Sequence, residues 1–363
     1  MAKNNELDML NGALLPKILM FSLPLALTGI LQLLFNAADV IVVGKFAGST
    51  SLAAVGATSA LVNLLTGAFI GISVGVNILV ARYAGCRDDA RVGRAVHSAI
   101  ALSLVLGVVT FLLGFFLSTP MLEWMDTPDD VLALASLYLR IYFIGIPGAL
   151  IYNFAAAILR AYGDTKRPLI FLAISGVLNV FLNLFFVIVC ELDVAGVAIA
   201  TVVSQYVAVV LILICLVRQE GPAKLKLREI RLHPDEALRM IQIGLPAGLQ
   251  SVVFNISNVM VQSCVNSFGA DVIAANTAAT NIAAFTYTAM NSVFHASITF
   301  TSQNLGARRY DRVMKIFWAC QATVLLIGIP LCILSTVFGP QLLSIYVSAN
   351  DPAYDSVIAM GLI

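Results

Sequence analysis

Residues 14–43 read LLPKILMFSLPLALTGILQLLFNAADVIVV, and this almost wholly apolar run decides the fold. About 20 apolar residues in helical form are enough to cross a bilayer. Similar runs recur between short polar connections, and 60% of the 363 residues are hydrophobic while only 11% are charged. Lipid offers no hydrogen bonds to the backbone, so such runs must be helices. The sequence therefore predicts an all-α polytopic membrane protein.

The apolar runs predict nine full spans and part of a tenth. The expected helices lie at about 14–43, 52–81, 95–118, 131–159, 167–190, 194–217, 237–267, 273–302 and 314–338. The tenth begins near residue 352, and because the chain stops inside it we expect a fragment of a longer protein, with a naturally shortened copy as the alternative. The six cysteines are scattered without metal-ligand spacing, so we expect neither disulfides nor a metal site built from them.

Basic residues gather on one side of these spans. When the connections are assigned alternately to the two sides, all 21 Lys and Arg residues except Lys45 and Arg140 fall on or beside the side of the N-terminus. Positively charged loops stay in the cytoplasm. The N-terminus is therefore expected to be cytoplasmic.

Two pairs of segments indicate an internal repeat. SLPLALTGILQLLFN (22–36) aligns with GLPAGLQSVVFNISN (244–258) at an offset of 222, and ARYAGCRDDARV (81–92) aligns with SQNLGARRYDRV (302–313) at 221. The offset spans six helices, so the repeats are expected to be parallel, as in some secondary transporters. We expect an N-terminal six-helix lobe (1–217), a cytoplasmic inter-lobe loop (218–236) and an incomplete C-terminal lobe (237–363).

A polar stripe follows the first predicted helix. Gln32, Asn36 and Asp39 are spaced by four and three residues, so they share one helical face. Asp39 is the carboxylate that falls within a predicted helix rather than in a loop or at a helix end, and a charge at that depth is costly unless it has a partner or a water-filled cavity. The alternative is a solvated acid, because Asp39 lies within about 7 Å of the predicted helix end.

The fifth and sixth predicted helices carry polar residues of the same kind. Asn179 and Asn183 are four residues apart, and Thr201 lies on the next helix. Together with Asp39 they offer carboxylate, amide and hydroxyl oxygens, which suit a hard monovalent cation, and a desolvated Asp39 could instead carry a proton. The alternative is plain hydrogen bonding between helices. Na⁺ and H⁺ both remain open.

The second half lacks a matching acid, since Val261 stands at the position equivalent to Asp39. Aromatic and amide side chains could instead line a cavity for an organic cation, or belong to the packed core. The candidates for the cavity are Phe35, Tyr152, Phe154, Gln250, Asn255 and Tyr287.

Four stretches together resemble the bacterial, DinF-like branch of the multidrug and toxic compound extrusion (MATE) family. They are SLPLALTGILQLLFNAADVIVVGKFAG (22–48), LRAYGDTKRPL (159–169), GVAIATVVSQ (196–205) and GLPAGLQ (244–250). The Gly-Asp-Thr-Lys-x-Pro run of the second stretch is the most specific, and the resemblance covers nearly the whole chain.

The resemblance implies two six-helix lobes around a central cavity and cation-driven export of drugs and other amphipathic, mostly cationic compounds from a bacterial cytoplasmic membrane. It implies a coupling-cation site at Asp39, Asn179, Asn183 and Thr201, with a possible Na⁺ at Asp39 as the one metal ion. Asn183 stands where many relatives have Asp, so the site carries one formal charge rather than two.

Other functions agree less well with the residues of the predicted spans. A flippase for a lipid-linked oligosaccharide or cell-wall precursor is the alternative, but an anionic substrate calls for basic residues in the cavity, and only Arg140 lies within a predicted span. An enzyme is not expected, because no His-Glu-x-x-His pair or phosphate-binding glycine loop occurs. We expect a monomer that handles small organic molecules in the bilayer, with no cofactor beyond the coupling ion and no nucleic acid partner.

Overall fold

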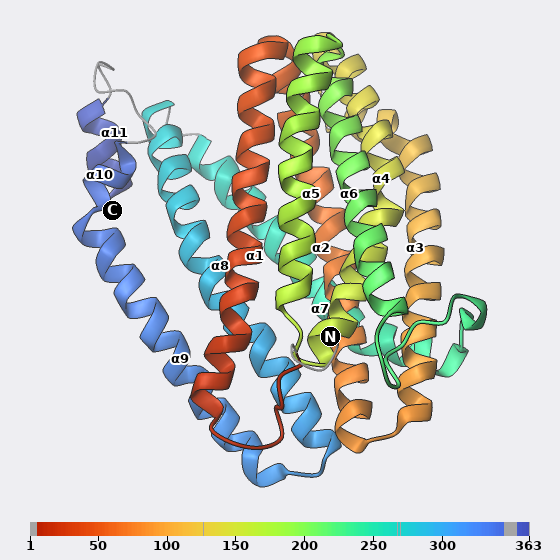
Figure 1. The fold of residues 1–363 in the computed structure, drawn as a ribbon. Helices are drawn as coiled ribbons and strands as arrows, with labels where there is room; N and C mark the ends of the chain where they lie inside the picture. Colours follow the sequence, from red (N-terminus) through yellow and green to blue (C-terminus); the bar gives the residue numbers. More distant parts are fainter. Residues whose placement is uncertain (1–5, 126, 267, 269, 345–353, 363) are drawn as a thin grey trace.

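The computed structural model describes residues 6–125, 127–266, 268, 270–344 and 354–362. Within these ranges every regular element is a helix (Figure 1). The elements are α1 (Leu14–Val42), η2 (Val43–Ala47), α2 (Gly48–Cys86), α3 (Asp89–Glu123), α4 (Asp129–Ala161), α5 (Lys166–Leu184), η3 (Phe185–Val189), α6 (Asp193–Val217), η4 (Leu227–Glu229), α7 (Pro234–Asn266), α8 (Ala270–Gly306), α9 (Tyr310–Val337), α10 (Gly339–Leu343) and α11 (Tyr354–Gly361).

Eight helices of the described part of the chain are long and apolar enough to cross a membrane. They match eight of the nine predicted spans, and α8 is the predicted span that is not among them. Its sequence is rich in Asn and Thr, which lowers its hydropathy. The predicted all-helical membrane fold is therefore confirmed, whereas the count of nine full spans stays a prediction.

The first connection differs from the prediction. The sequence predicts a connecting segment at 44–51, but α1 runs on through the π-helical turn η2, and α2 begins at Gly48. Gly48 has a φ of +86°, a left-handed conformation that glycine adopts without the steric cost of a Cβ atom. The chain can therefore turn within a very short segment, and the helical rod that starts with α1 reaches Ala47 rather than ending at Val43.

The main core fills the space between α2, α3, α4 and α6 in the first half of the chain. Large side chains such as Leu139, Phe143, Phe154 and Ile212 are at most 1% exposed there. A smaller core joins α1 to α8 and α9 and contains the edge-to-face pair of Phe21 and Phe300, whose ring centroids are 5.7 Å apart. Helix α1 therefore packs against the second half of the chain as well as the first.

One end of the bundle carries the α2–α3, α4–α5 and α8–α9 turns and the α6–α7 loop. It is the lower end in Figure 1, and we call it the basic end because the Lys and Arg residues concentrate there. Glycines let α2 of the first half approach α7 and α8 of the second half closely between the middle of the bundle and this end. A Cβ atom on Gly71 of α2 would lie 2.2 Å from the backbone of Gly248 on α7, and one on Gly85 would lie 2.1 Å from the Gln303 carbonyl oxygen on α8. Small residues are the usual means of close helix approach in membranes.

Candidate functional site

Asp39 lies well inside a helical rod. Its backbone carbonyl accepts a hydrogen bond from the amide of Val43, so the helix continues past it into η2. Helical structure extends eight residues beyond Asp39 to Ala47, which is about 12 Å at the usual helical rise. The carboxylate is therefore deeper than the sequence-based helix end suggests, and the interpretation as a solvated terminal acid is weakened.

Helix α5 supplies the direct partner of this carboxylate. The amide nitrogen of Asn183 donates a hydrogen bond to Oδ1 of Asp39. Asn183 is 0% exposed and Asp39 is partly buried, so the interaction is shielded from solvent on the α5 side. A hydrogen bond to an ionised group is stronger than one between neutral groups. The predicted proximity of Asp39 and Asn183 is thus seen directly in the geometry.

The polar chain continues from α5 to α6. Nδ2 of Asn183 lies 3.3 Å from Oδ1 of Asn179, one helical turn away. Nδ2 of Asn179 in turn donates to Oγ1 of Thr201 at 3.4 Å, and that hydroxyl donates to the Val197 carbonyl at 3.0 Å. All four residues predicted to form the cation site are therefore connected in one hydrogen-bonded chain across α1, α5 and α6.

One buried oxygen among these hydrogen-bonded side chains accepts no hydrogen bond from the described residues. Oδ1 of Asn183 is fully buried and makes no hydrogen bond with the described residues. A buried polar atom without a partner is costly and calls for an explanation such as a bound ion or water. The orphaned amide oxygen and the Asp39 carboxylate belong to side chains that are hydrogen-bonded to each other, and both are hard oxygen ligands of the kind that suit Na⁺.

Phe35 holds α1 against α5 at this level. A Cβ atom on Gly176 of α5 would lie 1.8 Å from Cε2 of Phe35, so the ring occupies the space that the missing side chain leaves. Phe35 precedes Asp39 by one helical turn, and Gly176 precedes Asn183 by about two turns. The glycine therefore helps to bring the carboxylate and the amide into contact.

Two tyrosines of α4 that are not among the predicted site residues lie near the same carboxylate. Tyr138 and Tyr142 are close enough to Asp39 to interact with its charge. Their rings are stacked with centroids 6.1 Å apart, and the Tyr142 hydroxyl is hydrogen-bonded to Gln205 of α6. The signal that could have revealed them is their spacing of four residues, which places both hydroxyls on one face of α4.

The other predicted site residues lie elsewhere. Gln32 and Asn36 are exposed, and within the described residues neither bonds to the Asp39 chain. Phe154 is 0% exposed in the main core, so it is a packing residue here rather than a cavity-lining one. Tyr152 is half-buried against the same core and donates its hydroxyl to the Pro168 carbonyl at 2.8 Å.

The candidates in the second half are on the surfaces of α7 and α8. Gln250 is exposed, and Asn255 is half-buried with its amide next to Gly67 of α2. Tyr287 is 57% exposed and stacks on Phe254 with ring centroids 6.5 Å apart. The lining of a substrate cavity by these three residues stays a prediction. Val261, at the position that matches Asp39, is an exposed apolar residue.

The observed fold and site define a polytopic helical membrane protein with a partly buried carboxylate and two buried amides inside its first half. The sequence profile of the MatE family matches residues 24–185 and 246–361, which is most of the chain. The chain therefore belongs to the MatE family, and the resemblance seen in the sequence is confirmed.

Similar bacterial proteins carry names that agree with this family. The chain is 29% identical to "Probable multidrug resistance protein YpnP" of Bacillus subtilis (strain 168), over 95% of this chain and 77% of that protein. It is 27% identical to "Probable multidrug resistance protein YoeA" of the same strain, over 92% of this chain and 74% of that protein. These relatives are transporter-family proteins rather than enzymes.

A solved structure shows the same fold. The outward-facing conformation of a multidrug resistance MATE family transporter of the MOP superfamily superimposes with a TM-score of 0.91. The match covers 100% of this chain and 80% of that chain at 22% sequence identity. At this identity the likeness establishes the architecture alone.

Proposed function

We propose that the protein is a cation-coupled antiporter that exports drugs and other amphipathic, mostly cationic organic compounds across a bacterial cytoplasmic membrane. Membership of the MatE family and the names of the bacterial relatives support multidrug export. A flippase for a lipid-linked precursor is not favoured by these relatives.

The observation that carries the coupling role is the contact between Asp39 and the buried Asn183. The carboxylate is held inside the helical bundle, and the orphaned Oδ1 of Asn183 belongs to the amide that it contacts. Na⁺ would gain oxygen ligands from both groups. A proton on Asp39 would instead let the acid donate a hydrogen bond to this amide oxygen once the Asn183 amide has rotated.

The cluster can drive a conformational change because the free energy of burying Asp39 differs between the ion-free and the ion-bound protein. An ionised Asp39 without a cation is costly in the membrane interior, whereas a bound cation or proton removes that cost. A ligand shifts a conformational equilibrium only by its difference in affinity for the two states. We propose that α1, α5 and α6 pack differently with and without the ion, and that this difference is coupled to release of the exported compound.

The orientation and the repeat form part of the same proposal. We propose that the basic end faces the cytoplasm, as the distribution of Lys and Arg favours, and that the two halves are parallel repeats that rock against each other. The end of the bundle opposite the basic end, near Asp39, then faces the outside.

The test is efflux from vesicles with imposed ion gradients. Purified protein in liposomes should export a fluorescent organic cation when an inward H⁺ or Na⁺ gradient is imposed, and the two gradients applied separately identify the coupling ion. Asp39→Asn should reduce gradient-driven export at least tenfold. Asp193→Asn removes an exposed carboxylate at the start of α6 and should leave export unchanged. Equal export by the wild type and Asp39→Asn would refute the coupling role.

A further inference from the structure

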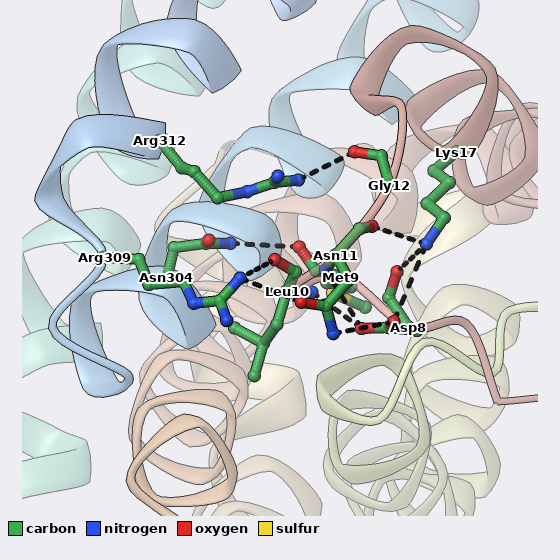
Figure 2. A network of polar contacts seen from close by, with 9 residues as sticks. All are labelled: Asp8, Met9, Leu10, Asn11, Gly12, Lys17, Asn304, Arg309 and Arg312. Atoms are coloured by element: carbon green, nitrogen blue, oxygen red, sulfur yellow. Dashed lines mark hydrogen bonds and ion pairs between the residues drawn. The ribbon is translucent and has the colours of Figure 1, made fainter.

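The segment before α1 crosses the basic end of the bundle. Residues 6–13, which we call the N-terminal strap, run from the α4–α5 turn and the end of α6 to the α8–α9 turn (Figures 1 and 2). The strap has no regular helix, yet its backbone carbonyls and several of its side chains are bound at both ends. Free terminal segments are poorly ordered unless they are tied down in this way.

The strap is fastened to the first half of the chain through the Gly-Asp-Thr-Lys motif. Oδ2 of Asp164 forms an ion pair with Nε of Arg167 at 3.2 Å. Nη1 of Arg167 donates to Oε1 of Gln219 at 2.8 Å, and Nε2 of Gln219 donates to Oε1 of Glu6 at 2.7 Å. Gln219 is only 2% exposed, so the centre of this relay is shielded, whereas Glu6 at its end is exposed.

Gly163 of the same motif makes room for the strap. It has a φ of +83°, and a Cβ atom there would lie 2.8 Å from the backbone nitrogen of Leu7. A side chain at this position would therefore both strain the turn and displace the strap. The Gly-Asp-Thr-Lys motif, on which the family resemblance depends most, therefore holds the strap in place and takes no part in the cation site.

The other end of the strap is fastened to the second half of the chain by three donors. Nδ2 of Asn304 donates to the Met9 carbonyl at 3.2 Å. Nη1 of Arg309 donates to the Leu10 carbonyl at 2.6 Å and to Oδ1 of Asn11 at 2.9 Å, and Arg312 donates to the Gly12 carbonyl at 3.1 Å. Figure 2 shows these side chains converging on the strap backbone from the α8–α9 region.

An apolar anchor lies between these polar contacts. The Met9 side chain is 1% exposed and belongs to the small core with Ile18, Phe21, Phe300 and Ile316. Burying the apolar side chain of a methionine stabilises the bound strap. The strap is therefore inserted between α1, α8 and α9 rather than lying on their surface.

The strap is also shaped for this path by its own contacts. Oδ1 of Asp8 accepts hydrogen bonds from the amides of Leu10 and Asn11, which bends the chain. Nζ of Lys17 donates to the carbonyls of Asp8 and Asn11 at 2.6 and 2.7 Å, which ties the bend to the first turn of α1. The bend presents the carbonyls of Leu10 and Gly12 to Arg309 and Arg312.

We infer that the N-terminal strap is a latch that holds the two halves of the chain together at the basic end and so favours the conformation that is closed there. This inference rests on the proposed alternating-access function, because opening at the basic end would separate the α4–α5 turn from the α8–α9 turn. A segment fastened to both must then release one of them. Release from the second half breaks the partly solvent-accessible contacts of Arg309 and Arg312 together with the buried contacts of Asn304 and Met9.

Hydrogen–deuterium exchange of the whole chain in lipid nanodiscs tests the latch. The double variant Arg309→Ala/Arg312→Ala removes three hydrogen bonds to the strap, and Arg309 makes no side-chain cap for α9 that would be lost with it. Arg228→Ala is the matched control, because it removes an exposed arginine from the α6–α7 loop without touching the strap.

The double variant should exchange faster in residues 77–86 and 299–306, where α2 and α8 meet near the basic end. A charge-assisted hydrogen bond that is partly exposed shifts such an equilibrium about threefold to tenfold. Residues 36–47 at the opposite end should not exchange faster, and Arg228→Ala should match the wild type. Gln219→Ala should act in the same direction as the double variant, because it releases the strap from the first half.

Two results would overturn the latch. One is exchange in the double variant that matches the Arg228→Ala control throughout. The other is faster exchange at both ends of α1, α2 and α8, which would show lost stability rather than opening at one end. The measurement needs neither a coupling ion nor an exported compound, so a failure of the proposed transport activity would not be mistaken for a failure of the latch.

Discussion

Thr299 donates a hydrogen bond from Oγ1 to Oδ1 of Asn77 at 2.9 Å, and the two positions are 222 residues apart, which is the period of the predicted repeat. Positions that are equivalent in a parallel repeat can touch only where the axis between the repeats passes. Gly85 and Gly306, which are 221 apart, each approach the helix of the other: their Cβ atoms would lie 2.1 Å from the carbonyls of Gln303 and Arg82. Both pairs support the predicted parallel repeat and would place its axis between α2 and α8.

Loss of this contact should weaken the junction between the halves. Thr299→Val leaves Oδ1 of Asn77 without its donor in a site where Thr299 is 1% exposed. An unsatisfied buried acceptor costs about 1–3 kcal/mol, so the midpoint of thermal unfolding in detergent should fall. Thr277→Val is the control, since Thr277 is exposed on the same helix and its hydroxyl donates to the Ile273 carbonyl one turn earlier. Equal midpoints for the two variants would contradict the role of the Asn77 contact.

Two glycines of α2 test whether close helix approach requires glycine, because only one of them lies against another helix. Gly71→Ala places a methyl group 2.2 Å from the backbone of Gly248, so α2 and α7 must move apart. Overpacking of this kind typically costs about 1–3 kcal/mol. Gly56→Ala meets nothing within 4 Å and should instead stabilise α2 by about 0.5–1 kcal/mol, because alanine is the better helix former. Thermal unfolding measures both, and a destabilised Gly56→Ala or a neutral Gly71→Ala would show that close helix approach is not what these positions require.

The helices themselves could be predicted because their physics is local. A run of about 20 apolar residues is visible without knowledge of its neighbours. The turn at Gly48 could not be placed, because the π-helical end of α1 depends on how the chain enters α2. The predicted connection at 44–51 is therefore wrong, and so is the predicted helix end at Val43.

The candidate site could also be predicted in part from local sequence patterns. Helical spacing shows that Gln32, Asn36 and Asp39 share a face, but exposure separates them: Asn183 contacts Asp39, while Gln32 and Asn36 stay exposed. Tertiary packing decides which helix lies against a polar face. Here the contact of Phe35 with Gly176 places α5 against α1. The same limit explains Phe154, because an aromatic residue on an apolar helix has the same sequence pattern whether it packs in a core or lines a cavity.

A second acid in the cluster should increase the affinity for Na⁺. Asn183→Asp would place two carboxylates in contact, and their mutual repulsion is relieved when a cation binds between them. We expect Na⁺ to bind at least tenfold more tightly than to the wild type, as measured by isothermal titration calorimetry at pH 8. Asn36→Asp is the control, because it adds an acid to the exposed part of the same stripe on α1. An equal gain from Asn36→Asp would show that added negative charge alone is sufficient, and that the position beside Asp39 is not special.

The fit of Phe35 into the space beside Gly176 can be tested by a double-mutant cycle. Gly176→Ala puts a methyl group 1.8 Å from the ring of Phe35, which should push α1 from α5 and separate Asp39 from Asn183. Phe35→Ala alone should cost about 1–2 kcal/mol, because the ring is only half-buried. In the double variant the new methyl group occupies space that the ring has left, so the two costs should not add, and the interaction energy should be about 1–3 kcal/mol. Thermal unfolding of the four proteins gives this energy. Additive costs would mean that Phe35 and Gly176 act independently, and that another contact positions α1 for the bond between Asp39 and Asn183.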